Sequence, residues 1–170
     1  YPGHGAGSAC GKNMMKETVD TLLNQKNINY AINGSFSRDV FINELTNNLP
    51  EPPAYFPSNV KLNLEGYLDS DVVLQKSLNP LSIKEFKSIS KNGEIVILDV
   101  RNQNIFSSGF IPGSIFIGLN GQFAPWVGSI LKNIDTHILL VCENGKETET
   151  ITRLSRIGFD NVLGYLDGGF

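Results

Sequence analysis

The sequence predicts an α/β fold with a mainly parallel sheet. Over residues 76–170, short apolar runs alternate with segments of helical pattern, which is typical of strands joined by crossover helices. One of these runs, "EIVILDV", is rich in β-branched residues, as expected for a strand that is buried on both faces. The start of a helix is also marked, because Ser82 followed by Glu85 three residues later matches a capping box.

The elements of this region are predicted in chain order as follows. The helix that begins after Ser82 is followed by two strands, "EIVILDV" and "SIFIGL". A helix is expected in "FAPWVGSILKNI". Pro125 falls in its first turn, where a backbone N–H has no partner within the helix, so proline is tolerated at this position. The strand "HILLVC" follows, then the helix "KETETITRLSRIG" with acidic residues early and Gly158 as its stop, then the strand "NVLGYL".

The N-terminal part has a different pattern. Residues 1–12 are rich in glycine and predict a loop. The segments "KETVDTLLNQKNINYAI" and "SRDVFINELTNNL" predict helices, with Ser37 as N-cap of the second. Prolines then end the helix, and "EPPAYFPSNVKLNLEGY" is interpreted as a linker. The domain boundary is predicted between about residues 58 and 76.

Composition limits the classes of function. The net charge of −3 arises from 14 basic and 17 acidic residues, with no basic block to neutralise phosphates, so no nucleic-acid partner is expected. The apolar runs are too short to span a bilayer, and no signal peptide opens the chain, so no membrane partner is expected. Cys10 and Cys142 are expected to be free thiols in a reducing cytoplasm. Because the chain starts at "YPGHG" without Met, we expect a piece of a longer protein.

Cys142 ends the run "HILLVC" and precedes the loop "ENGK" and a helix. Ligands of parallel α/β sheets bind beyond the carboxyl ends of the strands, where this cysteine is expected to lie. Two interpretations of the residue remain open. It is either a nucleophile or a small apolar residue of the core, since free cysteine is among the most buried residue types.

The nucleophile interpretation has a physical basis in the loop. A loop curled around the thiol directs backbone N–H groups at it, and the following helix adds its positive end; both lower the pKa of a thiol and bind anions. Gly145 supplies the backbone freedom for a tight loop. This interpretation predicts sulfur transfer, with Cys142 as a persulfide carrier between a sulfane-sulfur donor and a thiol acceptor.

Two stretches resemble the rhodanese pattern. "ILDVRNQNIFSSGFIPGSIFIGL" resembles its strand ending in Asp-Val-Arg, its Gly-His-Ile-Pro-Gly-Ala segment and its second strand, and "LLVCENGKETETITRLSRIGFDNVLGYLDGG" resembles its active-site half. "NGQFAPWVG" looks like the rhodanese-like domain that follows a metallo-β-lactamase domain in bacterial fusion proteins, relatives of persulfide dioxygenases. The resemblance implies a rhodanese-like parallel sheet flanked by helices over residues 63–170, with Cys142 as catalytic residue. It also implies a substrate-binding loop: Glu143, Asn144, Gly145, Lys146, Glu147 and Thr148.

The first residues, "YPGHGAGSACGK", resemble the last metal motif of the metallo-β-lactamase fold. Residues 1–62 would then be a mostly helical C-terminal remnant of such a domain plus a linker. His4 would be a ligand of an incomplete metal site, because the His-x-His-x-Asp-His motif is absent and His137 is the one other histidine. We therefore expect no cofactor in this chain, Fe or Zn in the parent protein, and the missing metallo-β-lactamase-fold domain as a partner.

The loop departs from the form Cys-x-x-Gly-x-Arg that active rhodaneses often carry. Cys142, Gly145 and Thr148 fit, whereas Glu147 stands where Arg or Thr is common, and Glu143 adds a second negative charge. Two like charges about 4 Å apart near a protein surface repel by roughly 4 kcal/mol. A helix terminus contributes at most about 2 kcal/mol. The loop is therefore poorly suited to small dianions.

Other residues have structural interpretations. Phe110 replaces the usual histidine of the Gly-His-Ile-Pro-Gly segment. Asp99 and Arg101 are expected to form an ion pair or cap a turn near the site. Trp126 is expected to be a packing anchor, within the domain or against the neighbouring domain, and Cys10 to be incidental.

Two functions agree with these observations. The first is a rhodanese-like sulfurtransferase that uses Cys142. The second is a degenerate, non-catalytic rhodanese module that packs on or regulates a metallo-β-lactamase-fold domain with dioxygenase or hydrolase activity. A Cys-x₅-Arg phosphatase is disfavoured, because position 148 is Thr where an Arg must clamp the phosphoryl group. The helices of residues 1–50 should expose apolar surface, dock on the rest of the chain, or form a homo-oligomer.

Overall fold

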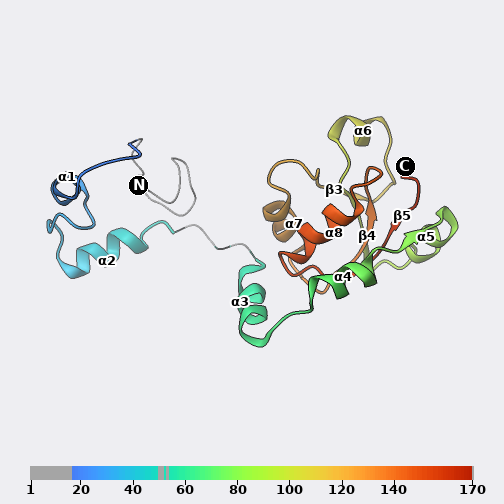
Figure 1. Ribbon diagram of the computed structural model, residues 1–170, viewed down its shortest axis with the longest axis horizontal. Coiled ribbons are helices and arrows are strands. Elements are labelled where there is room, and N and C mark those ends of the chain that lie inside the picture. The colour runs from blue at the N-terminus through green and yellow to red at the C-terminus, as the bar shows by residue number, and fades with distance from the viewer. Residues whose placement is uncertain (1–16, 50–51, 53, 170) are drawn as a thin grey trace. The chain divides into compact units, whose positions relative to one another are not determined.

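The computed structural model describes residues 17–49, 52 and 54–169, and Figure 1 shows the course of the chain. By its internal contacts the chain divides into two units, residues 1–51 and 52–170. The second unit contains the whole sheet and has its own buried core.

Two short helices, α1 (Leu22–Ile28) and α2 (Arg38–Thr46), form the described part of the first unit. The predicted N-cap of α2 is confirmed, because the Ser37 hydroxyl accepts a hydrogen bond from the Val40 N–H at 3.4 Å. Neither helix has a buried residue. The large exposed apolar side chains of this segment are Val19, Leu22, Leu23, Ile28, Ile32, Val40, Ile42, Leu45 and Leu49. The expected exposure of apolar surface is therefore confirmed for residues 17–49.

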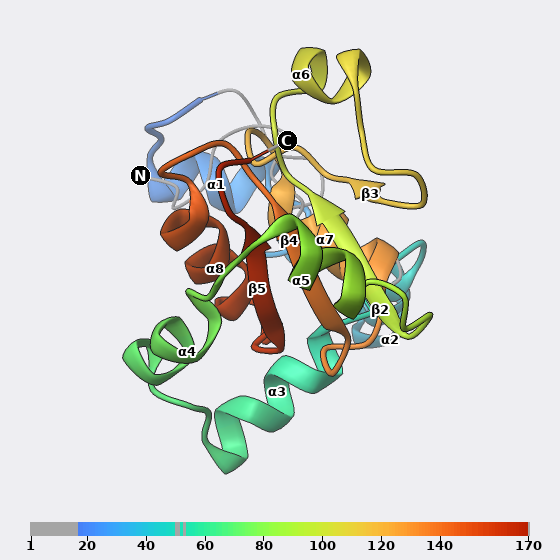
Figure 2. The same ribbon diagram turned by 90° about the vertical axis from the view of Figure 1, so that its right-hand side faces the viewer.

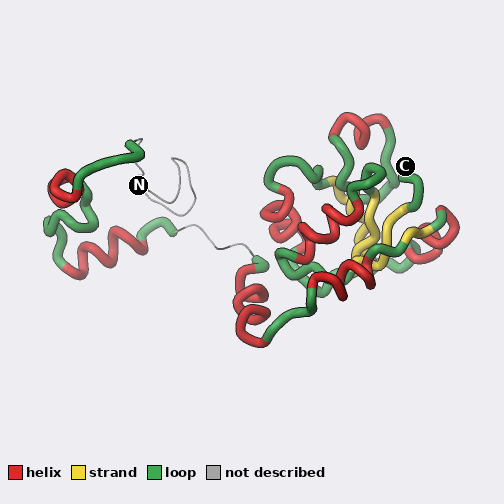
Figure 3. Tube along the Cα trace, viewed as in Figure 1, coloured by secondary structure: helices red, strands yellow, loops and turns green. Residues whose placement is uncertain are grey.

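The segment interpreted as a linker, residues 51–67, contains a helix that the sequence analysis does not predict. The chain forms α3 (Phe56–Glu65) and then α4 (Ser70–Ser77), as Figure 3 shows. The proline of α3 lies in its first turn, where the missing N–H has no helical partner to lose. Tyr55, the N-cap of α3, is buried, and its ring lies directly against Gly128 of a later helix. The sequence-based boundary between residues 62 and 63 falls inside α3.

The sheet has five strands, all paired in parallel, in the order β1-β5-β4-β2-β3. They are β1 (Pro80–Leu81), β2 (Ile95–Asp99), β3 (Ile115–Phe116), β4 (His137–Val141) and β5 (Val162–Leu166). Four of them confirm the four predicted runs, and β1 has no counterpart in the prediction. The predicted α/β fold with a parallel sheet is thus confirmed (Figure 2).

Four helices connect these strands: α5 (Ile83–Ile89), α6 (Gln103–Ser108), α7 (Phe123–Leu131) and α8 (Glu147–Ser155). The capping box of α5 is confirmed. The Ser82 N–H donates to the Glu85 carboxylate at 2.9 Å, and the Glu85 N–H donates to the Ser82 hydroxyl at 3.4 Å. The predicted helices over α7 and α8 are also present.

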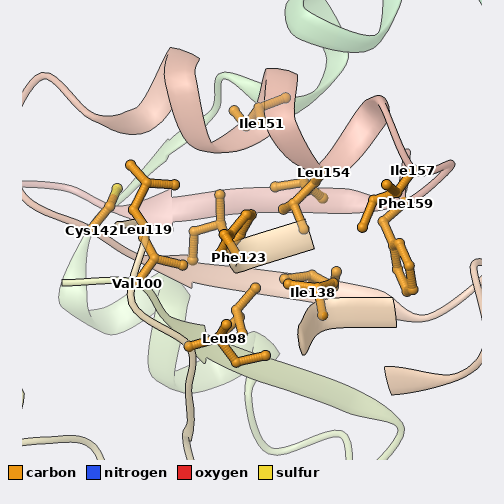
Figure 4. Close-up of a cluster of buried hydrophobic side chains, with 14 of the residues drawn as sticks. Leu98, Val100, Leu119, Phe123, Ile138, Cys142, Ile151, Leu154, Ile157 and Phe159 are labelled. Atoms are coloured by element: carbon orange, nitrogen blue, oxygen red, sulfur yellow. The ribbon is translucent and has the colours of Figure 1, made fainter. Parts of the chain in front are cut away.

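Strand β4 lies between two apolar clusters. Its residues Ile138 and Leu140 belong to the larger cluster, which includes side chains of α7 and α8 (Figure 4). Leu139 and Val141 point to the opposite face and join a smaller cluster with Phe86 of α5. This alternation follows from the two-residue period of a strand and explains why residues 138–141 are all apolar.

Candidate active site

Strands β2 and β4 are neighbours in the sheet, and the chain leaves their carboxyl ends towards opposite edges of the sheet. From β2 the chain crosses through α6 to β3 on one side, whereas from β4 it crosses through α8 to β5 on the other side. Ligands of open parallel sheets bind outside the carboxyl ends of strands at such a switch point. Cys142 follows β4 directly, and Asp99 ends the neighbouring strand β2. The prediction that Cys142 lies at the carboxyl end of a central strand is confirmed.

The loop after Cys142 is a tight turn that leads into α8. Gly145 has a φ of 81°, a conformation that disfavours side chains, and the Lys146 N–H donates to the Glu143 carbonyl at 3.0 Å. Lys146 is the N-cap residue of α8 but its side chain makes no capping bond. Its ammonium group instead pairs with Glu149 at 2.9 Å.

The Cys142 thiol lies inside the protein. Its side chain is 2% exposed and belongs to the same apolar cluster as Val100 and Leu119 (Figure 4). Burial raises the pKa of the Cys142 thiol to about 12, with the charges of Glu147 and Asp99 as further causes. The loop amides and the start of α8, which were expected to lower this pKa, do not outweigh burial and the two carboxylates. The negative charge of Glu147, which the sequence analysis places against anionic substrates, also opposes the Cys142 thiolate.

The carboxylate of Glu147 occupies part of the loop in which an anion was expected to bind. Its Oε1 accepts a hydrogen bond from the Gly145 N–H at 3.1 Å. The side chains of Asn144 and Thr148 are exposed. One of the backbone donors of the predicted substrate loop is thus already bound to a carboxylate of the protein.

Asp99 and Arg101 form the predicted ion pair, and both side chains are buried. The Arg101 Nη2 and Nε donate to the two carboxylate oxygens of Asp99, with the Nη2 contact at 2.7 Å. Arg101 Nη2 also donates to the Gly109 carbonyl at 2.9 Å. The guanidinium group thereby connects the end of β2 to the turn after α6, which is a positioning role at the edge of the site.

A pocket of about 620 Å³ opens at the switch point. Its lining residues come from the segment after β2 as far as the first residue of α6, from the end of β3 and the loop after it, from α7 and its N-cap, and from the Cys142 loop: Val100, Arg101, Asn102, Gln103, Phe116, Ile117, Gly118, Leu119, Asn120, Gln122, Trp126, Ile130, Glu143 and Lys146. Cys142 is not among them. One hydrogen bond joins two walls, because the Asn102 N–H donates to Glu143 Oε1 at 3.0 Å.

Sequence reasoning did not identify most of this lining. Trp126 is 59% exposed, so it does not anchor packing within this unit, and its expected packing against a neighbouring domain stays a prediction. The polar residues of the "NGQ" stretch after β3 were a usable signal, because the loops that follow parallel strands share one edge of the sheet. Phe110, at the position of the usual histidine, instead stacks on Phe106 with ring centroids 4.8 Å apart.

A comparison with protein families matches the rhodanese-like domain to residues 82–170, more than half of the chain. The chain belongs to the rhodanese-like family. This agrees with the parallel sheet and with the position of Cys142 after β4.

Two curated proteins are similar to the rhodanese-like domain. Thiosulfate sulfurtransferase GlpE of Shewanella oneidensis is 30% identical over 95 residues, which cover 55% of this chain and 90% of that protein. Thiosulfate sulfurtransferase GlpE of Pseudoalteromonas translucida is 31% identical over 91 residues, 53% of this chain and 83% of that protein. The similarity thus falls on about half of the present chain.

One solved structure is similar over nearly the whole chain. A metallo-β-lactamase from Staphylococcus aureus matches with a TM-score of 0.67 and 28% identity, over 96% of this chain and 43% of that protein. The chain therefore spans less than half the length of this structural relative.

The described residues do not fit a metal ion. His4 and Cys10 lie outside them, and His137 is exposed at the start of β4. Over residues 17–49, 52 and 54–169, no group of three or more His, Cys, Asp or Glu side chains is arranged to hold a metal. Over the same residues, no helix is both long enough and apolar enough to cross a bilayer.

Proposed function

We propose that the rhodanese-like domain transfers sulfane sulfur and that Cys142 carries the sulfur as a persulfide. The observation that supports this proposal is a cysteine placed directly after the central strand β4, at the switch point of the sheet. The domain is also similar to two proteins named thiosulfate sulfurtransferase. The partners of this reaction are a sulfane-sulfur donor and a thiol acceptor, in the cytoplasm.

The proposed transfer has two steps. The Cys142 thiolate attacks the outer sulfur of the donor, so that a new S–S bond forms, the donor's S–S bond breaks, and its electron pair leaves with sulfite when the donor is thiosulfate. An acceptor thiolate then attacks the outer sulfur of the Cys142 persulfide. The acceptor becomes the persulfide, and the Cys142 thiolate is regenerated. No external oxidant or reductant is required.

Burial makes the first step slow. With a thiol pKa of about 12, on the order of one molecule in 10⁴ to 10⁵ carries the thiolate at neutral pH. The outer sulfur of a donor must also reach a side chain that is 2% exposed, so the loop over Cys142 has to open. Dianionic thiosulfate additionally meets the carboxylates of Glu143 and Glu147.

The test is intact-protein mass spectrometry after incubation with an organic persulfide donor. We expect the mass of one added sulfur atom, located by peptide mapping on Cys142 rather than on Cys10, and no addition there in Cys142→Ser. Glu147→Arg should increase turnover of thiosulfate, because a cation replaces a carboxylate beside the loop. Absence of any sulfur on Cys142 with every donor, together with no effect of Glu147→Arg, would refute the catalytic role.

A non-catalytic module is the second candidate, and the buried, protonated state of Cys142 favours it. In this case the domain packs on, or regulates, a metallo-β-lactamase-fold domain that binds Fe or Zn in a longer protein. The similarity to the S. aureus metallo-β-lactamase and the exposed apolar side chains of residues 17–49 support this parentage. In such a full-length protein, Cys142→Ser would leave the metal-dependent activity unchanged, whereas deletion of the whole second unit, residues 52–170, would reduce it.

A further inference from the structure

A second pocket, of about 680 Å³, lies between α3, α4 and the end of α8. It is at the opposite end of the sheet from Cys142, because Gly158 and Asp160 lead from α8 into the amino end of β5 (Figure 2). We infer that this pocket binds a zwitterionic α-amino acid with an apolar side chain. The inference is independent of sulfur transfer and rests on two unpartnered oxygens, two opposite charges and an apolar wall.

Two side-chain oxygens of the lining have no hydrogen-bond partner among the residues that the structure describes. They are Asn59 Oδ1 and Asp160 Oδ1, and both atoms are shielded from solvent. Asn59 Oδ1 lies 3.4 Å from the position that a Cβ at Gly158 would occupy, so it borders the same turn after α8 from which Asp160 projects. Buried polar atoms are normally hydrogen-bonded, so these two acceptors favour a ligand with donors. An ammonium group carries three N–H donors and a charge opposite to that of Asp160.

The same pocket contains opposite charges that are not paired with each other. Asp160 contributes a carboxylate and Arg156 an exposed guanidinium group, and neither forms an ion pair within the described part of the chain. The third charged residue of the lining, Asp69, already caps α4, since its Oδ1 accepts the Asp71 N–H at 2.8 Å. A ligand with one charge would be attracted by one group and repelled by the other. A zwitterion satisfies both, with its ammonium group at Asp160 and its carboxylate on the guanidinium fork of Arg156.

Helices α3 and α4 and the segment between them supply the apolar part of the lining: Leu62, Tyr67, Leu68 and Leu74. Tyr67 and Leu68 are 74% and 52% exposed, so the described residues leave much of this surface in contact with water. Covering it with an apolar ligand side chain would favour binding. Sites for small ligands combine such an apolar lining with a few polar groups that fix the orientation, and a volume of about 680 Å³ is in their range.

The test is a titration of the full chain with L-phenylalanine, followed by the backbone amide signals in NMR spectra. We expect saturable shifts at Ser70 and Gly158, which line the pocket, and none at Gly145 in the Cys142 loop. Two analogues separate the charges without any change in the protein, because phenethylamine lacks the carboxylate and hydrocinnamate lacks the ammonium group. Each should bind about tenfold more weakly than L-phenylalanine, the effect of losing a hydrogen bond between charged groups.

Two substitutions assign the contacts to residues. Asp160→Asn keeps an oxygen acceptor but removes the charge, so it should weaken L-phenylalanine binding about tenfold without weakening that of hydrocinnamate, which has no ammonium group. Arg156→Gln should weaken L-phenylalanine binding by a similar factor without weakening that of phenethylamine, which has no carboxylate. Asp167→Asn is the matched control, because it removes the same charge from an exposed residue just after β5, at the other end of the strand. It should leave the binding unchanged.

Three results would overturn the inference: no saturable shift at the pocket amides with L-phenylalanine, equal affinity for the three ligands, or equal weakening by Asp160→Asn and Asp167→Asn. The first is also the result expected if Arg156 and Asp160 pair with each other in solution and leave no charge for a ligand. Equal affinities would show that the pocket takes an apolar group without discriminating between charges. None of these outcomes changes the proposed function, because sulfur loading of Cys142 is measured separately.

Discussion

Replacement of Glu147 by Gln should make Cys142 more reactive. Glutamine keeps an oxygen that can accept the Gly145 N–H, whereas the negative charge that opposes the thiolate is lost. Glu147→Gln therefore separates the effect of charge from the effect of the loop hydrogen bond. Burial, the larger cause of the raised pKa, remains unchanged.

The size of the expected change follows from the charge of Glu147, which is the second of the three causes that raise the pKa of Cys142. Loss of one nearby like charge lowers a pKa by roughly one pH unit, so the pKa of Cys142 should fall from about 12 to about 11. The thiolate fraction at a fixed, lower pH then rises about tenfold. The nucleophilicity of a thiolate decreases as its pKa falls, with a Brønsted coefficient of about 0.4–0.5, so the observed rate should rise only about threefold.

The assay is the rate of alkylation of Cys142 by iodoacetamide, with peptide mapping to separate Cys10. Glu94→Gln is the matched control, because it removes the same charge from an exposed residue at the amino end of β2, away from the site. We expect no change in that variant. Equal rates for Glu147→Gln and Glu94→Gln would show that the charge of Glu147 does not act on the thiol.

Two further predictions concern stability. Because the folded-state pKa of Cys142 is about 12 and its ordinary value is 9.0, the protonated thiol stabilises the fold below about pH 9, and each pH unit above that removes about 1.4 kcal/mol. Urea unfolding at several pH values should show this loss relative to Cys142→Ala, and a constant difference between the two would contradict it. Gly128→Ala should destabilise by about 1–3 kcal/mol, since its Cβ would overlap the Tyr55 ring. Thermal unfolding should show no comparable loss for Gly93→Ala, where the added Cβ meets no atom within 4 Å, and equal losses would refute the packing argument.

The fold of the second unit was predictable where local signals agreed with each other. Residues 138–141 of β4 are all apolar because they pack on both faces of the sheet, and the capping box of Ser82 and Glu85 satisfies backbone N–H groups at the start of α5. Helix α3 was missed because proline in this segment was interpreted only as a helix breaker. In α3 the proline occupies the first turn. Burial of Tyr55 against α7 stabilises this segment, although its apolar residues do not follow a clear helical period.

The candidate site was predictable in position but not in chemical state. That Cys142 follows a central strand could be inferred from the order of strands and helices. Its high pKa could not, because Val100 and Leu119 reach the thiol from segments more than twenty residues away in sequence. The exposure of Trp126 likewise depends on how α7 packs, which no pattern along the chain specifies.

The two edges of the sheet bear on how copies of this protein can associate. Both edge strands, β1 and β3, are only two residues long, and β1 begins with Pro80, which has no N–H to donate to another strand. An incoming strand would therefore find almost no backbone ladder to extend, and open-ended sheet-to-sheet growth is disfavoured at either edge. Any contact between copies must use side-chain surfaces instead, and its strength should then respond to substitutions at exposed apolar positions rather than to changes along the sheet.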